Sequence, residues 1–495
     1  MTSPLQVRIP YVFAKAQGVL PWRETEKTIT VLVRSDANVE ALQEIRRLSD
    51  KTLHIEESSF ERFGEALARI YNTDGEDSAI MLNDELARDT DLSQLLQEIP
   101  MTEDLLDNDA QAPVIRMINA LLLQALREQV SDIHFEPYEM RSVVRFRLDG
   151  VLRDIVEPPR ALHAALVSRL KIMAALDIAE KRLPQDGRIT LRLGGKSVDV
   201  RVSTLPTGYG ERVVLRLLDK EAARLDLAAL GMSEALLVGV DRIIREPHGI
   251  FLVTGPTGSG KTTTLYAALS RLDRARINLM TVEDPIEYAL DGIAQTQVNP
   301  RIELSFARAL RALLRQDPDV IMIGEIRDLE TAQIAVQASL TGHLVLATLH
   351  TNDAPSAITR LVDMGVESYL LASSLLGVLA QRLVRVLCPH CRTKAAPSDG
   401  ERMLLRQTGL QEVDALYAPT GCDECNHHGY RGRTGVYELL RIDDVLRRRI
   451  HEGAVEDTLR QDAIRAGMIT LRQDGARWLS EGTTSLAELV RVTRA

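Results

Sequence analysis

The stretch "TGPTGSGKTTTLYAA", residues 254–268, decides how this chain folds and what it can bind. Gly255, Gly258 and Gly260 let the backbone turn tightly, so that its N–H groups point at anionic oxygens. The apolar run before it, "GIFLVT", is typical of a buried parallel strand, and "KTTTLYAALSRL" is typical of a helix whose N-terminus faces phosphates. A chance glycine-rich turn rarely has this complete spacing between a strand and a helix. We therefore predict a nucleotide site here.

The predicted nucleotide-binding residues belong to this loop and to the first turn of the helix. Lys261 provides a fixed positive charge for the β- and γ-phosphates, and the Thr262 hydroxyl is a predicted ligand of Mg²⁺. The other predicted contacts come from Gly255, Pro256, Thr257, Gly258, Ser259, Gly260 and Thr263.

Length and composition limit the class of protein. A chain of 495 residues is expected to form two to four domains, each with its own core. No apolar run approaches the roughly 20 residues that cross a bilayer, and "MTSPLQVRIP" lacks the core of a signal peptide. We expect a cytosolic protein whose contact with a membrane is made through partners.

The formal charge of −10 argues against a sequence-independent grip on nucleic acid, which needs basic grooves. Charge segregated to one domain remains the alternative. Ordinary solubility is the plainer explanation of the acidic balance, and we predict no nucleic-acid partner.

All four cysteines lie in two C-x-x-C pairs, "CPHC" at 388–391 and "CDEC" at 422–425. Two such knuckles can present four thiolates tetrahedrally to Zn²⁺. A redox pair or unligated buried thiols is the alternative, but a cytosolic chain has little use for disulfides. We predict a structural zinc site formed by Cys388, Cys391, Cys422 and Cys425.

Four regions follow one another along the chain. Residues 1–82 mix short strand-like runs with amphipathic helical stretches, as in a small α/β module. Residues 83–111 are predominantly acidic, which is typical of a linker, with an exposed acidic helix as the alternative. Residues 112–235 form a second α/β domain, with a hairpin turn at Asp149-Gly150. Residues 236–495 contain the phosphate loop and include the cysteine module at 386–428.

Arginines recur at every second residue in the later strands of the second domain, "SVDVRVSTLP" and "ERVVLRLLD". This alternation puts Arg201, Arg212 and Arg216 on one face of a sheet. They could serve an anionic ligand or cover a solvated face, and the pattern alone favours the solvated face.

Carboxylates follow two apolar strands beyond the phosphate loop. Glu283, Asp284 and Glu287 end "INLMTVEDPIEY", and Glu325 ends "DVIMIGEIRD" with Arg327 beside it. Open parallel sheets present catalytic groups at such strand ends. Glu325 is therefore the candidate that orients or deprotonates the water attacking a γ-phosphate. Gly324 stands where an aspartate commonly helps to hold Mg²⁺, so either Glu325 acts through water or Glu283 and Asp284 supply the missing metal contact.

Two histidines bracket the strand "HLVLATLH", His343 and His350. Histidines at strand ends are usually hydrogen-bonded structural residues, but a place beside the phosphate loop would suit a γ-phosphate sensor. Arg308, Arg311 and Arg315 share a helical stretch and either reach a nucleotide or solvate a surface.

The motifs together resemble the secretion and pilus assembly ATPases. "GPTGSGKTTT", "TVEDPIEY", "LRALLRQDPDVIMIGEIRD" and "TGHLVLATLHTND" look like their Walker A, Asp box, Walker B and His box. The likeness continues through "SDIHFEP", "RLPQDGRI" and "ERVVLRLL" upstream and through both cysteine pairs to "GRTGVYELL" downstream. It covers residues 112–495. The start, "RIPYVFAKAQGVL", is similar to type II secretion ATPases, the GspE family.

The resemblance implies a RecA-like P-loop motor domain, with ATP, Mg²⁺ and structural Zn²⁺ as cofactors. It assigns Glu325 to the attacking water and Glu283 to the metal or the water, and it brings Arg201 and Arg216 to the phosphates from the preceding domain. It also puts three further arginines near nucleotide or a subunit interface, namely Arg311, Arg315 and Arg327.

The same resemblance implies a homo-oligomeric ring, most plausibly a hexamer, on the cytoplasmic face of the inner membrane. Its expected partners are the cytoplasmic domain of an inner-membrane anchor, docking on residues 1–82, and an inner-membrane platform protein. ATP hydrolysis would drive pseudopilus assembly and protein export. The alternatives are a type IV pilus extension ATPase, a nucleic-acid translocase with a RecA-like core, and a non-catalytic nucleotide-responsive scaffold, which intact Lys261 and Glu325 disfavour.

Overall fold

The computed structural model describes residues 108–193, 196–219, 226–410 and 413–493, together with Ile80–Met81 and parts of residues 14–66. The chain divides into two compact units, Met1–Lys220 and Glu221–Ala495. The division falls before the predicted boundary at residue 235, because Leu227 and Met232 already pack into the core of the second unit. The predicted acidic linker lies outside the described residues up to residue 107.

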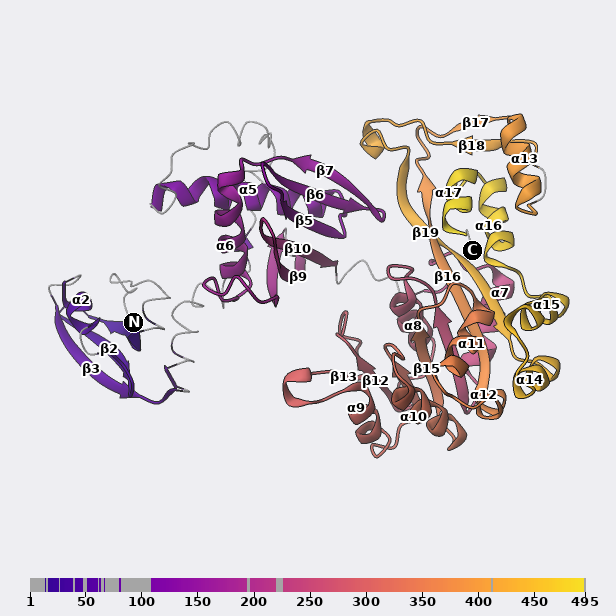
Figure 1. Cartoon of the computed structure of the whole chain (residues 1–495), viewed down its shortest axis with the longest axis horizontal. Coiled ribbons are helices and arrows are strands. Elements are labelled where there is room, and N and C mark those ends of the chain that lie inside the picture. Colours follow the sequence, from indigo (N-terminus) through magenta and orange to yellow (C-terminus); the bar gives the residue numbers. More distant parts are fainter. Residues whose placement is uncertain are drawn as a thin grey trace. The chain divides into compact units, whose positions relative to one another are not determined.

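The N-terminal part of the first unit holds a small three-stranded sheet (Figure 1). Strand β1 pairs antiparallel with β2, and β2 pairs parallel with β3. The alternating apolar residues of these strands share one core with the helix and with Phe63. The elements are β1 Val19–Glu24, β2 Thr28–Arg34, α2 Ala41–Arg47 and β3 Thr52–Ser58.

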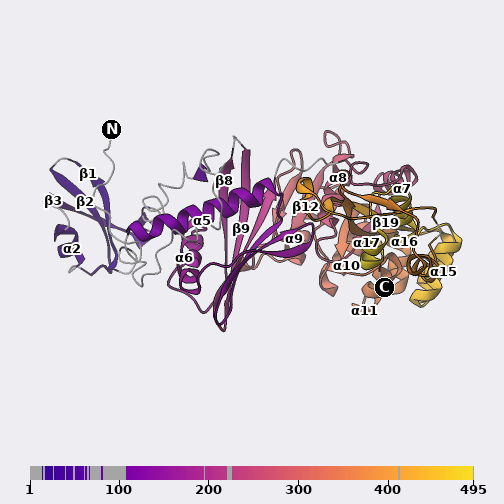
Figure 2. The ribbon, with the colours of Figure 1, turned by 90° about the horizontal axis from the view of Figure 1, so that it is seen from above.

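A seven-stranded sheet follows in the same unit, in the order β4-β8-β9-β10-β5-β6-β7. Its apolar face shares one core with helices α5 and α6, which can be followed in Figure 2. The predicted hairpin is confirmed, because β6 pairs antiparallel with β7 and Asp149 and Gly150 both have positive φ. The elements are β4 Ile80–Met81, α5 Asn108–Arg127, β5 Asp132–Pro137, β6 Ser142–Leu148, β7 Val151–Val156, α6 His163–Met173, β8 Gln185–Leu193, β9 Lys196–Thr207 and β10 Gly210–Asp219.

The second unit is built on another seven-stranded sheet, in the order β13-β12-β14-β15-β11-β16-β19. All neighbouring strands are parallel except the last pair, β16 and β19. The strands are β11 Gly249–Thr254, β12 Leu279–Glu283, β13 Ala294–Gln297, β14 Val320–Ile323, β15 Leu344–Leu349, β16 Leu375–Leu387 and β19 Tyr430–Arg441.

Helices cover both faces of this sheet, as separate apolar cores on its two sides indicate. One core joins the sheet to α7 and α8, and the other joins it to α9, α10, α11 and α12. The predicted α/β class, with a P-loop core after smaller α/β parts, is confirmed. The helices are α7 Glu234–Ile244, α8 Lys261–Ser270, α9 Phe306–Leu313, α10 Leu329–Leu340, α11 Ala354–Asp363 and α12 Ser368–Ser374.

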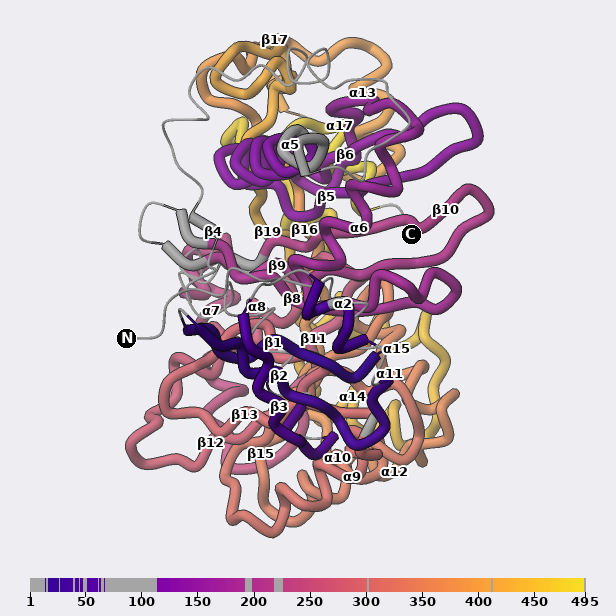
Figure 3. Tube along the Cα trace, turned by 90° about the vertical axis from the view of Figure 1, so that its left-hand side faces the viewer, coloured from indigo at the N-terminus to yellow at the C-terminus, as the bar shows by residue number. Residues whose placement is uncertain are grey.

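The cysteine module is inserted between β16 and β19, and Figure 3 shows the two strands running toward it. It contains β17 Thr393–Ala395, α13 Asp399–Gln407 and β18 Leu416–Ala418. The chain ends in α14 Asp444–His451, α15 Glu456–Arg465, α16 Leu471–Ser480 and α17 Leu486–Val492, which pack against the sheet. Within the described residues, every helix is too short or too polar to cross a bilayer.

Candidate nucleotide site and metal centre

The phosphate loop lies at the carboxyl end of β11, between that strand and α8. Gly255 has φ 151°, and a Cβ there would meet the Gln381 carbonyl at 2.5 Å, so only glycine fits. Gly260 precedes α8 in the left-handed region, with φ 86°. In the described part of the chain, the N–H groups of Lys261, Thr262 and Thr263 have no hydrogen-bond partner. Open donors at a helix N-terminus are an anion site.

Lys261 turns back onto this loop. Its ammonium donates to the Gly255 carbonyl at 2.8 Å and to the Pro256 carbonyl at 3.2 Å. Burial lowers the pKa of this ammonium to about 8, an effect that Glu325 opposes and the nearby Arg382 strengthens. The carbonyls therefore hold the side chain where a phosphate would accept its protons.

A hydrogen-bonded chain links Lys261 to Glu325 through His350. Lys261 Nζ lies 3.4 Å from His350 Nδ1, and His350 Nε2 lies 3.1 Å from Glu325 Oε1. Burial, reinforced by the charge of Lys261, lowers the pKa of His350 and keeps it neutral. An ammonium can only donate, so Nδ1 accepts and Nε2 carries the proton that is donated to Glu325. The histidine is thus oriented between the phosphate-binding cation and the candidate catalytic carboxylate.

Arg327 holds the other oxygen of Glu325, at 2.8 Å, and also approaches Asp284 at 3.5 Å. Glu325, His350, Arg327 and Asp284 therefore meet at the carboxyl edge of the sheet, beyond β14, β15 and β12. Asp284 is 37% exposed and faces this group, so it is available as the second carboxylate for Mg²⁺ that Gly324 does not supply.

Glu283, by contrast, is 2% exposed and bound by three donors of its own chain. Thr281 donates at 2.6 Å, Gln295 at 3.0 Å, and the Tyr266 hydroxyl makes a short hydrogen bond. A carboxylate with this many internal donors is already satisfied. The geometry therefore assigns the metal contact to Asp284 rather than to Glu283, and gives Glu283 the task of joining α8, β12 and β13.

His343 is corrected by the structure. It precedes β15, whereas His350 follows it, so the two lie at opposite edges of the sheet, about 20 Å apart for six residues of strand. His343 Nδ1 lies 2.9 Å from the Ala338 carbonyl at the end of α10. It is a structural residue and lies away from the phosphate loop.

Arg311 and Arg315 make their contacts outside the phosphate loop. Arg311 pairs with Glu330 of α10 at 2.5 Å, and Arg315 donates to the Arg311 carbonyl at 2.7 Å. Within the second unit they form part of the surface of α9 and α10. A subunit contact remains open to them.

The arginine-bearing strands of the first unit form a charged row. Arg201 of β9 lies directly opposite Arg216 of β10, which lies opposite Asp132 of β5. Arg216 Nε bonds Asp132 Oδ1 at 2.8 Å, although the arginine side chain is 55% exposed. Two neighbouring guanidinium groups on one polar face form an anion site with one resident carboxylate.

Gln381 is a residue of the site that motif analysis missed. Strand β16 continues past the end of β11 and runs beside the phosphate loop, where Gln381 Nε2 donates to the Ser259 carbonyl at 2.6 Å. Its neighbour Arg382 binds the Asn352 carbonyl at 2.7 Å, and so fixes the segment after His350. A lone glutamine in the apolar run "VLAQRLV" is the sequence signal for this contact.

We expect Gln381→Leu to weaken ATP binding roughly tenfold, because the Ser259 peptide loses the donor that fixes the orientation of the loop. Equilibrium titration with a fluorescent ATP analogue measures the effect. The matched control is Thr484→Val, which removes a hydrogen bond to Arg385 on the same strand, away from the loop. Equal losses in both variants would contradict a role in positioning the loop.

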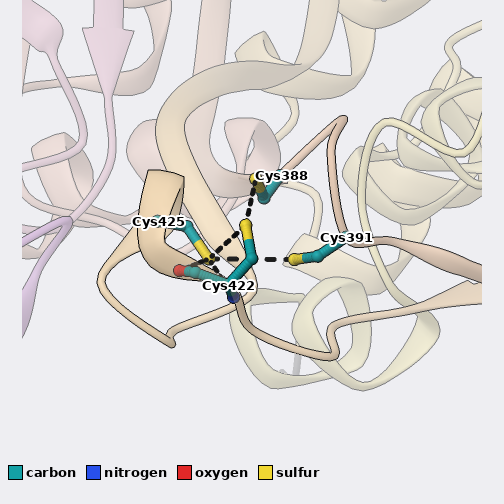
Figure 4. A group of neighbouring side chains, drawn as sticks. All are labelled: Cys388, Cys391, Cys422 and Cys425. Carbon is teal, nitrogen blue, oxygen red and sulfur yellow. Dashed lines mark hydrogen bonds between the residues drawn. The ribbon is translucent and has the colours of Figure 1, made fainter.

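The four cysteines come together as predicted (Figure 4). The Sγ–Sγ distances are 3.9 Å for Cys388 and Cys422, 3.7 Å for Cys391 and Cys425, and 3.8 Å for Cys422 and Cys425. A tetrahedron with Zn–S bonds of about 2.3 Å has edges of about 3.8 Å, whereas a disulfide needs about 2.05 Å. The geometry fits one zinc ion and no disulfide.

Electrostatics at this cluster also favour a cation. Burial and the neighbouring thiols raise the pKa of Cys422 to about 12. Against its burial, the N–H groups of Cys422 and Gly429 lower the pKa of Cys425 to about 7. Four thiolates this close need a bound metal to remain ionised together.

One zinc per chain is expected to copurify, and Cys388→Ser combined with Cys391→Ser is expected to release it. Loss of two ligands unfolds the module while leaving Lys261 and its loop intact, so thermal stability falls before nucleotide affinity does. Metal analysis and thermal scans measure both effects. The control is His390→Ser, an exposed residue between the two cysteines. Zinc-free protein from a preparation without chelators would refute the site.

Comparison with known proteins agrees with these sites. Residues 107–491 match the family described as Type II/IV secretion system protein, and residues 8–71 match an amino-terminal domain family of GSPII protein E. The chain is 58% identical to the type II secretion system protein HxcR of Pseudomonas aeruginosa, over 98% of this chain and 99% of the relative. It is 53% identical to the type II secretion system ATPase E of Vibrio cholerae, over 98% and 97%.

A solved structure extends the comparison to the fold. The crystal structure of the pilus retraction motor PilT with bound ADP is 25% identical, with a TM-score of 0.51, and the match covers 76% of this chain and 96% of that one. The chain belongs to the Type II/IV secretion system protein family.

Proposed function

We propose that this chain is the ATPase of a type II secretion system, hydrolysing ATP to drive pseudopilus assembly and protein export. The observation that carries the proposal is the chain of contacts from Lys261 through His350 to Glu325 at the mouth of a P-loop. It joins a phosphate-binding cation to a carboxylate that can act on water. The similarity to type II secretion proteins along the whole chain supports the choice of system.

In the proposed reaction, Lys261 and the open N–H groups of α8 bind the β- and γ-phosphates. Glu325 orients the attacking water, and neutral His350 reports the position of the γ-phosphate by donating to Glu325. Thr262 and Asp284 are the residues that would hold Mg²⁺, which supplies charge neutralisation at the phosphates when bound. Arg201 and Arg216 add positive charge when the two units close over ATP.

The proposed assembly is a homo-oligomeric ring, with six subunits as the inferred number. A head-to-tail contact between identical chains closes into such a ring. Residues 1–82 would dock the cytoplasmic domain of an inner-membrane anchor, and the ring would act on an inner-membrane platform protein from the cytoplasmic side. The match of residues 8–71 to a domain of GSPII protein E supports this docking role and favours type II secretion over pilus extension.

A nucleic-acid translocase remains the competitor from another class, since it shares the RecA-like core. The two functions differ in what stimulates turnover. We expect the anchor's cytoplasmic domain to raise ATP turnover of the full chain, and single- or double-stranded DNA to leave it unchanged. Stimulation by DNA at physiological salt, with no response to the anchor domain, would overturn the proposal.

A further inference from the structure

Strand β19 forms the outer edge of the second unit's sheet, and half of its backbone groups point away from β16. The parity is set by Tyr437, whose N–H leaves the sheet to bind Asp474 at 2.9 Å. Gly435, two residues earlier, donates to the Leu230 carbonyl and accepts from Trp478. The N–H and C=O groups of Leu439 and Arg441 share this outward direction.

These outward groups of Leu439 and Arg441 meet no partner among the described residues. They line a groove of about 520 Å³ that continues into a second hollow of about 280 Å³. Helix α7 borders the groove on one side, and the turn at residues 466–469 borders it on the other. An unpaired strand edge at the floor of a groove is a template for another strand.

The walls of the groove have different chemistry. On the α7 side, Arg242 and Arg441 are exposed and without an ion-pair partner in the described part of the chain, and Val238 is 66% exposed. On the other side, Ile469 is 55% exposed and Met468 lines the floor. Leu439 packs beneath Gly239 of α7, so side chains at odd positions of β19 face the arginine wall.

The acidic residues of the groove leave these arginines available. Asp443 caps α14 through the Leu446 N–H, and Asp474 is taken by Tyr437 and Arg477. Arg447 is bound to the Ala372 carbonyl and to Asp444. Glu246 is the one acidic side chain of the lining without such a contact among the described residues, against two free arginines.

We propose that this groove binds an extended segment of a partner protein, which adds a strand to β19 beside Leu439 and Arg441. Successive side chains of an added strand point to opposite sides. The segment therefore has acidic residues toward Arg242 and Arg441, alternating with aliphatic residues toward Met468 and Ile469. The proposal is independent of nucleotide chemistry, because none of these residues contacts the phosphate loop.

The test uses the full-length protein and a fluorescein-labelled peptide in which valine and glutamate alternate. We expect saturable binding and slowed hydrogen exchange of the Leu439 and Arg441 amides. N-methylation of alternate peptide bonds removes the backbone pairing and should weaken binding at least about tenfold. The double variant Arg242→Glu and Arg441→Glu should lose this peptide and gain the one in which valine alternates with lysine. Arg448→Glu, an exposed arginine of α14 outside the groove, is the matched control and should bind like the parent.

Each other outcome counts against the proposal. Equal binding of the N-methylated peptide would mean that the β19 edge is not the docking element. An unchanged peptide preference in the double variant would refute the charge assignment. Protection of both amides on raising the protein concentration alone would identify the occupant as a second copy of this chain and would overturn the choice of a separate partner.

Discussion

Replacing Glu325 by glutamine is expected to reduce ATP hydrolysis by at least about 100-fold while ATP still binds. The amide keeps the shape of the side chain, but it loses the charge that orients the nucleophile. It also cannot accept from His350 and Arg327 with both of its end atoms, as the carboxylate does. Single-turnover hydrolysis measures the loss, and equilibrium binding of ATP measures what is retained.

Glu330→Gln is the matched control, because it neutralises an exposed glutamate of α10 whose contact is with Arg311. It should hydrolyse ATP at close to the parental rate. A Glu325 variant with more than a few per cent of parental turnover at saturating ATP would show that another group activates the water.

Arg216→Ala, and separately Arg201→Ala, should lower kcat at least about tenfold with a much smaller change in nucleotide affinity. A cation that arrives as the units close neutralises charge on the transferring phosphoryl group, so it acts on the transition state. Arg216 must exchange its 2.8 Å contact with Asp132 for the nucleotide, which restricts its contribution to the closed state. Comparison of single-turnover rates with binding of a non-hydrolysable analogue separates the two effects.

Arg212 provides the internal comparison for this row. It lies on the same strand and face, but Glu136 holds it at 2.7 Å and His134 at 3.1 Å. Arg212→Ala should therefore change kcat less than either of the other variants. Near-normal turnover in the Arg216 and Arg201 variants would leave the row as a solvated sheet face.

The parts of the site that could be predicted from sequence are those whose chemistry is local. The phosphate loop and each C-x-x-C pair are contiguous, so spacing alone carries the geometry. Glu325 was predictable because the carboxyl ends of parallel strands meet at one edge of the sheet. The alternation of arginines likewise foretold that Arg201 and Arg216 share a face, and their direct pairing agrees.

Other features depend on pairings that no local pattern reveals. The burial of Glu283 requires Tyr266 from α8 and Gln295 from β13. The role of Gln381 follows from β16 being longer than its neighbour β11, which the apolar run alone does not disclose. His343 was misjudged because the two ends of a strand were treated as one place, although they belong to opposite edges of the sheet.

The length of β16 has a mechanical consequence. The same strand touches the phosphate loop at Gln381 and ends at Leu387, next to the first cysteine of the metal centre. Between Gln381 and Cys388 the chain spans about 23 Å, so a tilt of roughly 10° at the nucleotide end would swing the cysteine end by about 4 Å. Strand β16 is thus a lever, with its fulcrum in the sheet and the cysteine module at the tip, and it would turn the loss of a phosphate into a displacement large enough to push another protein.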